Sequence, residues 1–464
     1  MLYQYKNDDG KVFNLAPHNN FTIESENIFT TIVGQNGTGK SRLLESIIYE
    51  LIEYEDANLN SLIEKRLKKY HTPVKLIVVS TSPFDKFPIY DEEQHEIPIN
   101  YDYLGLKNLD SKSFSKSYLS KIIKSLIDSL DKNKDRIKKL SSILNYLGYI
   151  NRLELEFVLD NDWKNIIENF DTTLHNVSDN NDEEAIFIFE KILENQPKKE
   201  IYTSLFYENF EYNKRFKYKI NRIINLILEM MSLVTLPTLV IHNNLTLLDK
   251  NEFSKTSNFD IDEISLMLEI GIIKLQEVYL EKKDINQHLL ISQASSGEQS
   301  VIMSMLGIAS KIENGSLICI DEPEVCLHPA WQEKYIKFLM NTFKDYKGCH
   351  FLIATHSPQI TSKLEDENCY VMSMDDGKLV SASTLNNKSI DFQLAHVFKS
   401  PGFKNEYLTR ELISLITLIS EGKGQEELHS TKIEEILALK DVIDDNDPVK
   451  ELIKMVESVK KELS

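Results

Sequence analysis

Hydrophobic residues form two kinds of run in the N-terminal part of the chain. Residues 28–33 and 74–79 are continuous apolar or β-branched runs, which is typical of parallel strands buried on both faces. Between these runs, apolar residues from Leu43 to Leu51 recur at the spacing of one helical face. The pattern therefore predicts a strand, a loop, a helix and a second strand.

A similar alternation returns after residue 260. In chain order the pattern predicts a helix at 261–276, strands at 278–283 and 288–292, a helix from about Ser296, a strand at 316–320, a helix from about Ala330 and a strand at 350–355. Asp376 and Gly377 supply the turn of a further hairpin. Strands that alternate with helices predict an α/β fold, with a mostly parallel sheet covered by helices.

The middle and the end of the chain have a different pattern. From about 105 to 235, Lys, Ser, Asp and Asn mix with Leu and Ile at helical spacing, but the polar breaks exclude a long coiled coil. The last 75 or so residues are also helical and rich in Glu and Lys. We expect four parts: an N-terminal lobe of the core at 1–100, a mainly helical insertion at 101–260, a C-terminal lobe of the core at 261–385, and a helical, partner-binding extension at 386–464.

Charge and length narrow the classes of function. The 464 residues are enough for about three domains. Acidic residues outnumber basic ones by 72 to 53, and the net charge of −19 repels phosphate polymers and excludes a histone-like coat protein. Contact with nucleic acid would need a local basic patch such as 132–139, although basic residues spaced along a helix are more often a solvated face.

The remaining composition predicts a cytoplasmic protein without a membrane partner. The four cysteines form no CxxC pair, which favours a reducing compartment over disulfides or structural zinc. The N-terminus has no signal-peptide pattern, and the longest oily stretch, 223–241, is interrupted by polar residues and a proline.

A phosphate-binding motif lies between the first strand and the first helix. Residues 34–41 read GQNGTGKS and fit G-x-x-x-x-G-K-[ST]. In this context the backbone N–H groups cradle phosphates, Lys40 contacts the β- and γ-phosphates, and Ser41 ligates Mg²⁺. The alternative is a plain glycine-rich turn. The residues expected to bind the nucleotide here are Gly34, Asn36, Gly37, Thr38, Gly39, Lys40, Ser41 and Arg42.

Two carboxylates end the strand predicted at 316–320. Asp321 is placed to hold Mg²⁺, and Glu322 to orient the attacking water as a general base. Such a strand end is usually an ordinary turn, but a phosphate loop in the same chain favours the functional interpretation. His356 follows the strand at 350–355 and could bond a γ-phosphate, although a single histidine at a strand end is usually structural.

A second anion site is predicted where the helix near Ser296 begins. Ser295, Ser296, Gly297 and Glu298 offer small side chains and free amides at a helix N-terminus. A helix cap, with Ser295 or Ser296 as N-cap and Glu298 nearby, explains the same residues without a ligand.

The order of these motifs resembles that of the ABC-type ATPases. The residues within each motif are similar to those of the branch that includes RecF-like, SMC-like and OLD-type proteins. Residues 321–329 (DEPEVCLHP) resemble a segment common in bacterial defence ATPases. Residues 82–85 (SPFD) and 403–408 (FKNEYL) are similar to the ATPase subunits of two-component anti-phage systems such as Septu and retron-Septu, with the PARIS ATPase as a neighbour.

The resemblance implies a shared catalytic site that uses ATP and Mg²⁺. Two copies would close head to tail, as a dimer or within a higher oligomer, so that Ser295 to Glu298 of one copy meet the phosphate held by Lys40 of the other. Glu322 carries over as the base, Asp321 as the Mg²⁺ partner and His356 as the switch histidine.

The chain departs from the ABC pattern at three places. His328 replaces the aspartate of transporter cassettes. The position where a Q-loop glutamine is usual is occupied by Ser80, Thr81 and Ser82. An aromatic side chain usually stacks on the adenine ring, and the candidates for this role are Tyr3 and Phe13.

A nuclease centre is not expected in this chain. The search for a TOPRIM-like set of carboxylates finds only Glu421, Asp445 and Asp447, which lie too close together, and a solvated acidic loop is the default interpretation. We therefore predict an ATP-driven sensor or regulatory subunit of an anti-phage complex that controls a separate effector, a nuclease, in response to DNA or another nucleic-acid trigger. The alternative is a RecF- or SMC-like DNA-binding ATPase in repair, and a transporter cassette fits worst.

Overall fold

The computed structural model describes the chain in blocks. The described residues are 1–18, 26–53, 66–69, 71–82, 84–89, 100–107, 114–132, 143–161, 238–242, 264–265, 267–268, 271–283, 287–325, 327–364, 368–385, 388–424 and 426–463. Most of the predicted insertion at 101–260 lies outside these ranges, as do residues 133–139 of the Lys-rich stretch.

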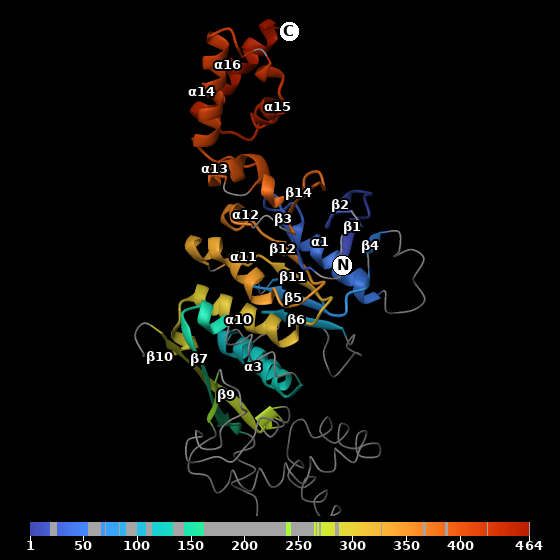
Figure 1. The fold of residues 1–464 in the computed structure, drawn as a ribbon, viewed down its shortest axis with the longest axis vertical. Helices are drawn as coiled ribbons and strands as arrows, with labels where there is room; N and C mark the ends of the chain where they lie inside the picture. Colours follow the sequence, from blue (N-terminus) through green and yellow to red (C-terminus); the bar gives the residue numbers. More distant parts are fainter. Residues whose placement is uncertain are drawn as a thin grey trace, which may run out of the picture.

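A seven-stranded sheet forms the centre of the molecule (Figure 1). Its order is β14-β13-β3-β12-β11-β5-β6, and all neighbours are parallel except β13 and β14. The strands are β3 (Ile28–Val33), β5 (Leu76–Ser80), β6 (Tyr101–Gly105), β11 (Leu317–Asp321), β12 (His350–Ala354), β13 (Cys369–Ser373) and β14 (Leu379–Ser381). This confirms the predicted α/β class, and β6 extends the sheet just past the expected lobe boundary at residue 100.

Helices cover both faces of this sheet. They are α1 (Lys40–Glu53), α3 (Phe114–Lys132), α10 (Ser296–Lys311), α11 (Pro329–Phe343) and α12 (Pro358–Ser362). Successive side chains of a strand point to opposite faces. In β11, Ile318 and Ile320 belong to the core that α3, α10 and α11 cover, whereas Leu317 and Cys319 belong to the core that α1 covers. Helices α1 and α10 therefore lie on opposite faces.

A small antiparallel sheet packs beside α1. Its strands are β1 (Leu2–Lys6), β2 (Val12–Asn14) and β4 (Leu67–Lys69), in the order β2-β1-β4. Leu2, Tyr5, Phe13 and Leu67 join the apolar face of α1 in one core. The expectation of short strands around one strong helix is confirmed for the described N-terminal residues.

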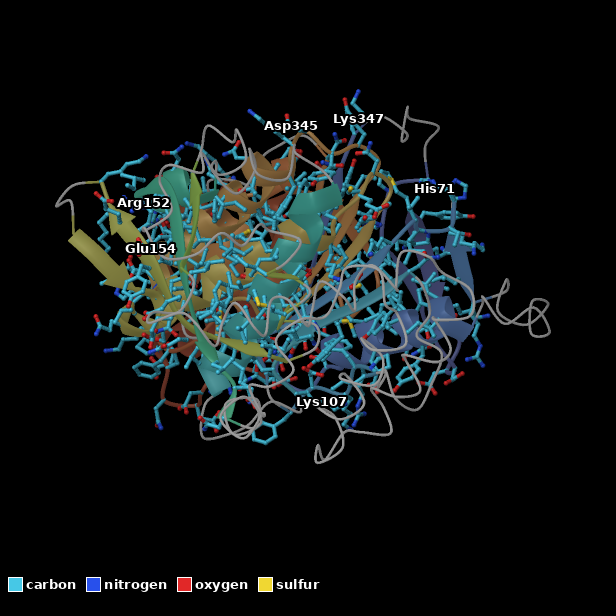
Figure 2. The ribbon with its side chains drawn as sticks, turned by 90° about the horizontal axis from the view of Figure 1, so that it is seen from below. His71, Lys107, Arg152, Glu154, Asp345 and Lys347 are labelled. Carbon is cyan, nitrogen blue, oxygen red and sulfur yellow. The ribbon has the colours of Figure 1, made fainter. Side chains whose placement is uncertain are left out.

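A second antiparallel sheet lies on the side of α3 and α10 (Figure 1). Its strands are β7 (Tyr149–Leu159), β8 (Thr238–His242), β9 (Ile273–Lys282) and β10 (Gln287–Leu290), in the order β10-β9-β7-β8. In β7, Leu153, Leu155 and Phe157 are buried, and Arg152 and Glu154 alternate with them and form a 3.5 Å ion pair. Figure 2 shows this pair across the molecule from His71. The described part of 101–260 is thus not only helical, because the period of two in β7 produces a strand.

The helix predicted at 261–276 is wrong at its C-terminal end. Residues 264–265 and 267–268 are helical, but β9 already begins at Ile273. The reason is local: Ile273 and Leu275 are buried while Lys274 between them is exposed, and this alternation suits a strand. The predicted strand pair is confirmed, although residues 291–293 form a 3-10 turn, η2 (Ile291–Gln293), and not strand.

The C-terminal residues form a helical lobe that projects from the core (Figure 1). Its elements are η3 (Ala382–Thr384), α13 (Ile390–Phe392), the π-helical turn η4 (Gln393–Val397), α14 (Glu406–Ser420), η5 (Glu427–His429), α15 (Thr431–Leu437) and α16 (Pro448–Leu463). Leu408, Leu412, Ile436 and Ile453 are fully buried in a core of its own. The predicted helical extension is confirmed.

The acidic loop predicted around Asp445 is only partly solvated. Asp445 is exposed and pairs with Lys450 at 2.7 Å. Asp447 is buried and accepts hydrogen bonds from the backbone N–H groups of Lys404 and Val449. It therefore ties the start of α16 to the segment before α14.

Cysteines and membrane spans add little to this picture. Cys319, Cys349 and Cys369 are buried and form no disulfide with one another, whereas Cys326 lies outside the described residues. Within the described ranges, every helix is too short or too polar to cross a bilayer.

Candidate nucleotide-binding site

The loop between β3 and α1 has the conformation that its glycines predict. Gly37 and Gly39 have φ angles of +80° and +91°, in the left-handed region that other residues rarely adopt. Gly34 is packed so closely that an added Cβ would lie 3.0 Å from Cβ of Met374. The loop thus turns tightly into α1, whose first N–H groups are available to an anion.

The side chain of Lys40 lies over this loop and is almost fully buried. Its ammonium donates hydrogen bonds to the carbonyl oxygens of Gly34 at 2.8 Å and Gln35 at 3.1 Å, and it lies 3.0 Å from Nδ1 of His356. Burial lowers the pKa of Lys40 to about 8, and nearby carboxylates, led by Glu324, oppose this shift. At neutral pH a cation is therefore held against the loop.

Ser41 and Asp321 meet beside this lysine. The Ser41 hydroxyl donates to Oδ1 of Asp321 at 3.0 Å, although the two residues are 280 positions apart in the chain. They meet because β3 and β11 both pair in parallel with β12, so that their carboxyl ends share one edge. Burial raises the pKa of Asp321 to about 7, and the Ser41 hydrogen bond counteracts this.

The donors of this pair suit a magnesium ion. A hydroxyl and a carboxylate are hard oxygen ligands, and Mg²⁺ usually binds through one or two such groups together with waters and substrate phosphates. Among the described residues, His, Cys, Asp and Glu side chains form no cluster of three that could hold a metal ion alone. Ser41 and Asp321 therefore fit a Mg²⁺ ion whose remaining ligands come from phosphates and water.

Glu322 follows Asp321 in a strained conformation. Its φ angle is +51°, in the left-handed region, which a residue with a side chain occupies at a cost of about 1–3 kcal/mol. The backbone is held there by hydrogen bonds from its N–H to Ala354 O at 2.9 Å and from the Thr81 hydroxyl to its carbonyl at 2.7 Å. In this conformation the Glu322 carboxylate faces His356, and Oε1 of Glu322 lies 3.4 Å from Nε2 of His356.

The contacts of His356 define which ring nitrogen carries the proton. Lys40 can only donate, so Nδ1 of His356 must accept. Nε2 then carries the hydrogen and faces Glu322. The hydrogen bond from His356 holds the pKa of Glu322 below its usual value, so this carboxylate is ionised at neutral pH. Lys40, His356 and Glu322 form one chain of contacts.

Sequence reasoning gave Glu324 no role, but the structure includes it in this site. Its Oε1 accepts a hydrogen bond from the backbone N–H of His356. Its Oε2 is buried and has no hydrogen-bond partner among the described residues. The signal available in the sequence was a second glutamate, two positions after Glu322, in the turn that follows the strand.

The serine-rich helix start is a satisfied cap in this chain. Ser295 is the N-cap of α10, and its hydroxyl and the carboxylate of Glu298 form a capping box. Lys282 of β9 pairs with Glu298 at 3.4 Å. No contact recorded between described residues links 295–298 to the phosphate loop, and α10 lies on the sheet face opposite α1. Within one chain the two predicted anion sites are therefore separate.

Other predicted residues lie around the loop with less definite roles. Asn36 and Arg42 are exposed at the loop and on the first turn of α1, and the Thr38 hydroxyl donates to Gln35 O at 2.8 Å. Phe13 is only 3% exposed within the core, so it cannot offer an open ring face to adenine. Tyr3 is partly buried and stays a candidate.

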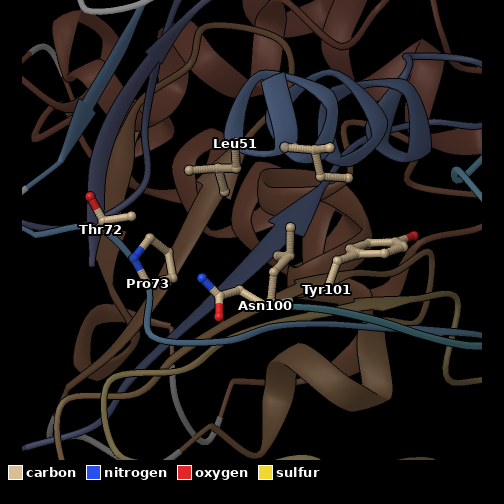
Figure 3. A pocket seen from close by; sticks show the side chains of 7 residues that line it. Leu51, Thr72, Pro73, Asn100 and Tyr101 are labelled. Atoms are coloured by element: carbon tan, nitrogen blue, oxygen red, sulfur yellow. The ribbon is translucent and has the colours of Figure 1, made fainter. Parts of the chain in front are cut away.

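A small hollow lies at the far end of α1 (Figure 3). It is lined by Leu51, Ile52, Thr72, Pro73, Leu76, Asn100 and Tyr101. The helix has 14 residues and therefore spans about 20 Å. The hollow is thus far from Lys40 and does not belong to the phosphate site.

Comparison with known sequences finds an AAA-domain family and two probable ATPases of retrons. The profile of the family described as "AAA domain, putative AbiEii toxin, Type IV TA system" matches residues 29–362. Retron Ec83 probable ATPase of Escherichia coli is 27% identical over 115 residues, 22% of this chain and 20% of that protein. Retron Vc95 probable ATPase of Vibrio cholerae serotype O1 biovar El Tor is 24% identical over 190 residues, 40% and 34% of the two chains.

A third relative and two solved structures complete the comparison. Protein ea59 of Escherichia phage lambda is 26% identical over 353 residues, 74% of this chain and 48% of that protein. The chain thus matches from a fifth to about half of each relative's length. An Smc head domain of Pyrococcus furiosus is 12% identical over 82% of this chain and 96% of that chain, with a TM-score of 0.29. Stu0660 of Streptococcus thermophilus is 12% identical and covers 100% of this chain and 94% of that chain, with a TM-score of 0.30.

Proposed function

Because the chain belongs to the AAA-domain family of putative AbiEii toxins and is an ATPase related to retron ATPases, we propose that it is an ATP-driven regulatory subunit in anti-phage defence. ATP and Mg²⁺ bind at the loop that holds Lys40, and hydrolysis occurs beside Glu322. The observation that carries the proposal is that two sets of contacts meet at one edge of the sheet: Lys40–His356–Glu322 and Ser41–Asp321.

Each residue of the site has a separate role in ATP hydrolysis. The loop N–H groups and Lys40 bind the phosphates, and Lys40 exchanges its bonds to the Gly34 and Gln35 carbonyls for phosphate oxygens. Ser41 and Asp321 hold Mg²⁺, which neutralises charge that develops on the phosphates. Glu322 orients the attacking water and accepts its proton, for which its lowered pKa keeps it ionised.

Magnesium dependence tests the metal assignment. Ser41→Ala removes the hydroxyl that bonds Asp321, and we expect the Mg²⁺ concentration for half-maximal ATPase rate to rise about tenfold. Titration of the rate with MgCl₂ measures this. Ser420→Ala, at an exposed helix position, is the control. An unchanged Mg²⁺ requirement in Ser41→Ala would remove Ser41 from the metal site.

The catalytic site is completed by a second copy of the chain. Support comes from Ser295 and Ser296, which are exposed at the start of α10 but lie on the sheet face opposite α1. A head-to-tail pair would bring the helix start of each copy to the phosphate held by the other, within a dimer or a larger ring of dimers.

Mixing two inactive variants tests this sharing. Lys40→Ala removes the phosphate contact, and Ser296→Arg blocks the helix start, so neither variant should hydrolyse ATP alone. A mixture forms pairs in which one site combines the intact Lys40 of one copy with the intact Ser296 of the other, and we expect ATPase activity to return. If the mixture stays inactive although both variants self-associate, the site is not shared.

The C-terminal lobe binds a separate effector, a nuclease, and communicates with the ATP site. Support comes from one contact, in which Nε2 of Gln35 in the phosphate loop donates to Lys399 O at 2.9 Å. Lys399 lies between η4 and α14 and has a φ angle of +52°, so this connection is sensitive to small backbone shifts.

Co-purification with the products of neighbouring genes tests the effector proposal. The full chain, tagged, is isolated with ATP or with ADP, and a nuclease should be retained in a nucleotide-dependent way. DNA from infected cells should change the ATPase rate if nucleic acid is the trigger. If no neighbouring product is retained with either nucleotide, the regulatory role is refuted, whereas ATP hydrolysis stands.

A further inference from the structure

The chain reverses direction immediately after β11. The N–H of Val325 donates to Glu322 O at 3.1 Å, and the N–H of Leu327 donates to Glu324 O at 2.9 Å. Pro323 lies buried between the two glutamates and fixes one φ angle of the turn. The left-handed φ of Glu322 starts this reversal. Both glutamate side chains are consequently directed toward the segment after β12.

Glu324 occupies an unfavourable place for a carboxylate without a specific task. Its Oε2 is buried, and burial raises the pKa of the carboxyl group, whereas hydrogen bonds from the His356 and Glu324 backbones and from the Thr355 side chain oppose this shift. Removing a carboxylate from water costs free energy, and the cost is larger when the group is charged. An apolar residue would avoid this cost but would offer no oxygen to the His356 N–H, so the side-chain acceptor is what this position retains.

Its contribution is to the position of His356. Three groups hold this residue: the Lys40 ammonium at Nδ1, the Glu322 carboxylate at Nε2, and Oε1 of Glu324 at the backbone N–H. The neighbours of His356 are held differently, since Thr355 N–H bonds Ile32 O and Ser357 N–H bonds the Thr355 hydroxyl. Glu324 is thus the anchor of the His356 backbone.

We propose that Glu324 is a positioning residue, which holds the His356 backbone so that the imidazole bridges Lys40 and Glu322. The inference rests on the proposed ATP hydrolysis at Glu322 and deepens it. Glu324 acts through His356 and is not itself in contact with phosphate. Loss of the anchor therefore lowers kcat and leaves KM and ATP affinity nearly unchanged, because a displacement near 1 Å at a catalytic group costs about 100-fold in rate.

Two variants separate anchoring from charge. Glu324→Gln keeps the length of the side chain and an oxygen that can accept the His356 N–H, so we expect kcat within about threefold of wild type. Glu324→Asp keeps the charge but is one methylene shorter, so its oxygen cannot reach, and kcat should fall about 10- to 100-fold, as for other supporting residues of active sites. Glu421→Gln, an exposed carboxylate of the C-terminal lobe, is the matched control.

The readouts are steady-state kcat and KM, with equilibrium binding of a fluorescent ATP analogue and the melting temperature as tests of folding. An active Glu324→Asp together with an inactive Glu324→Gln would overturn the inference, because charge and not length would then matter. Equal, normal kcat in both variants would overturn it as well. Glu322→Gln is measured in parallel: if it turns over normally, the proposed hydrolysis beside Glu322 fails, whereas an inactive Glu322→Gln beside a normal Glu324→Asp refutes only the positioning role.

Discussion

Glu322→Gln is expected to keep its affinity for ATP and to lose about two to four orders of magnitude in kcat, the usual contribution of a general base. The amide has the same size as the carboxylate but cannot take a proton from water. The Nε2–H of His356, 3.4 Å from Oε1 in the wild type, can still donate to the amide oxygen. Phosphate release from saturating ATP measures kcat, and a fluorescent analogue measures binding.

A matched glutamate tests the specificity of this effect. Glu313 is exposed at the opposite end of the strand β11 that leads to Glu322, so Glu313→Gln should hydrolyse ATP at the wild-type rate. Turnover in Glu322→Gln at more than a tenth of the wild-type rate would show that another group accepts the proton.

Lys40→Ala should weaken ATP binding by at least about 100-fold. The ammonium donates two loop hydrogen bonds that it can transfer to phosphate oxygens, and hydrogen bonds to charged groups contribute about 1.5–3 kcal/mol each. Its loss also leaves the charges of Asp321, Glu322 and Glu324 without the cation that they face, and these carboxylates then repel phosphate. Isothermal titration with ATP and Mg²⁺ measures the dissociation constant.

The control for this variant is Lys378→Ala. Lys378 is an exposed lysine near the β13–β14 turn, and it pairs only with Asp376 among the described carboxylates within ion-pair distance. Its removal changes the net charge of the protein by the same amount as Lys40→Ala. If both variants lost affinity equally, the effect would reflect net charge and the loop assignment would be refuted.

The phosphate loop and the carboxylates could be predicted because their signals are local. A strand, a glycine pattern and a helix in immediate succession leave few conformations for residues 34–41. Ser41 and Asp321 also follow predicted strands, and parallel strands align their carboxyl ends at one edge. Their 3.0 Å contact is therefore a consequence of the sheet, which the alternating pattern had indicated.

The second sheet could not be predicted in the same way. β7 pairs with β9 although Leu153 and Leu280 are far apart in the chain. The residues between them mix polar and apolar types at helical spacing, and this pattern led to the prediction of a mainly helical insertion. A short alternating run such as Leu153, Leu155 and Phe157 favours a strand only when a partner strand packs against it. The helix predicted through residue 276 failed for the same reason.

The role of Glu324 was hidden because it depends on one backbone angle. If Glu322 continued as extended strand, Glu324 would lie about 7 Å farther along the strand, away from the His356 N–H to which it now bonds. The left-handed φ of Glu322 redirects the chain, and nothing in residue type predicts that angle. Phe13, one of the two adenine candidates, was lost for the opposite reason, because it has a suitable ring but is buried in the core, whereas Tyr3 stays a candidate.

The separate hydrophobic core of α14, α15 and α16 has a consequence for how such proteins diverge. Substitutions on the outer surface of α14, α15 and α16 should leave the phosphate site intact, because the buried side chains of these three helices form a cluster of their own. If this lobe binds the effector as proposed, recognition of the effector and use of ATP can evolve at different rates, with the contact between Gln35 and Lys399 as the junction that both preserve.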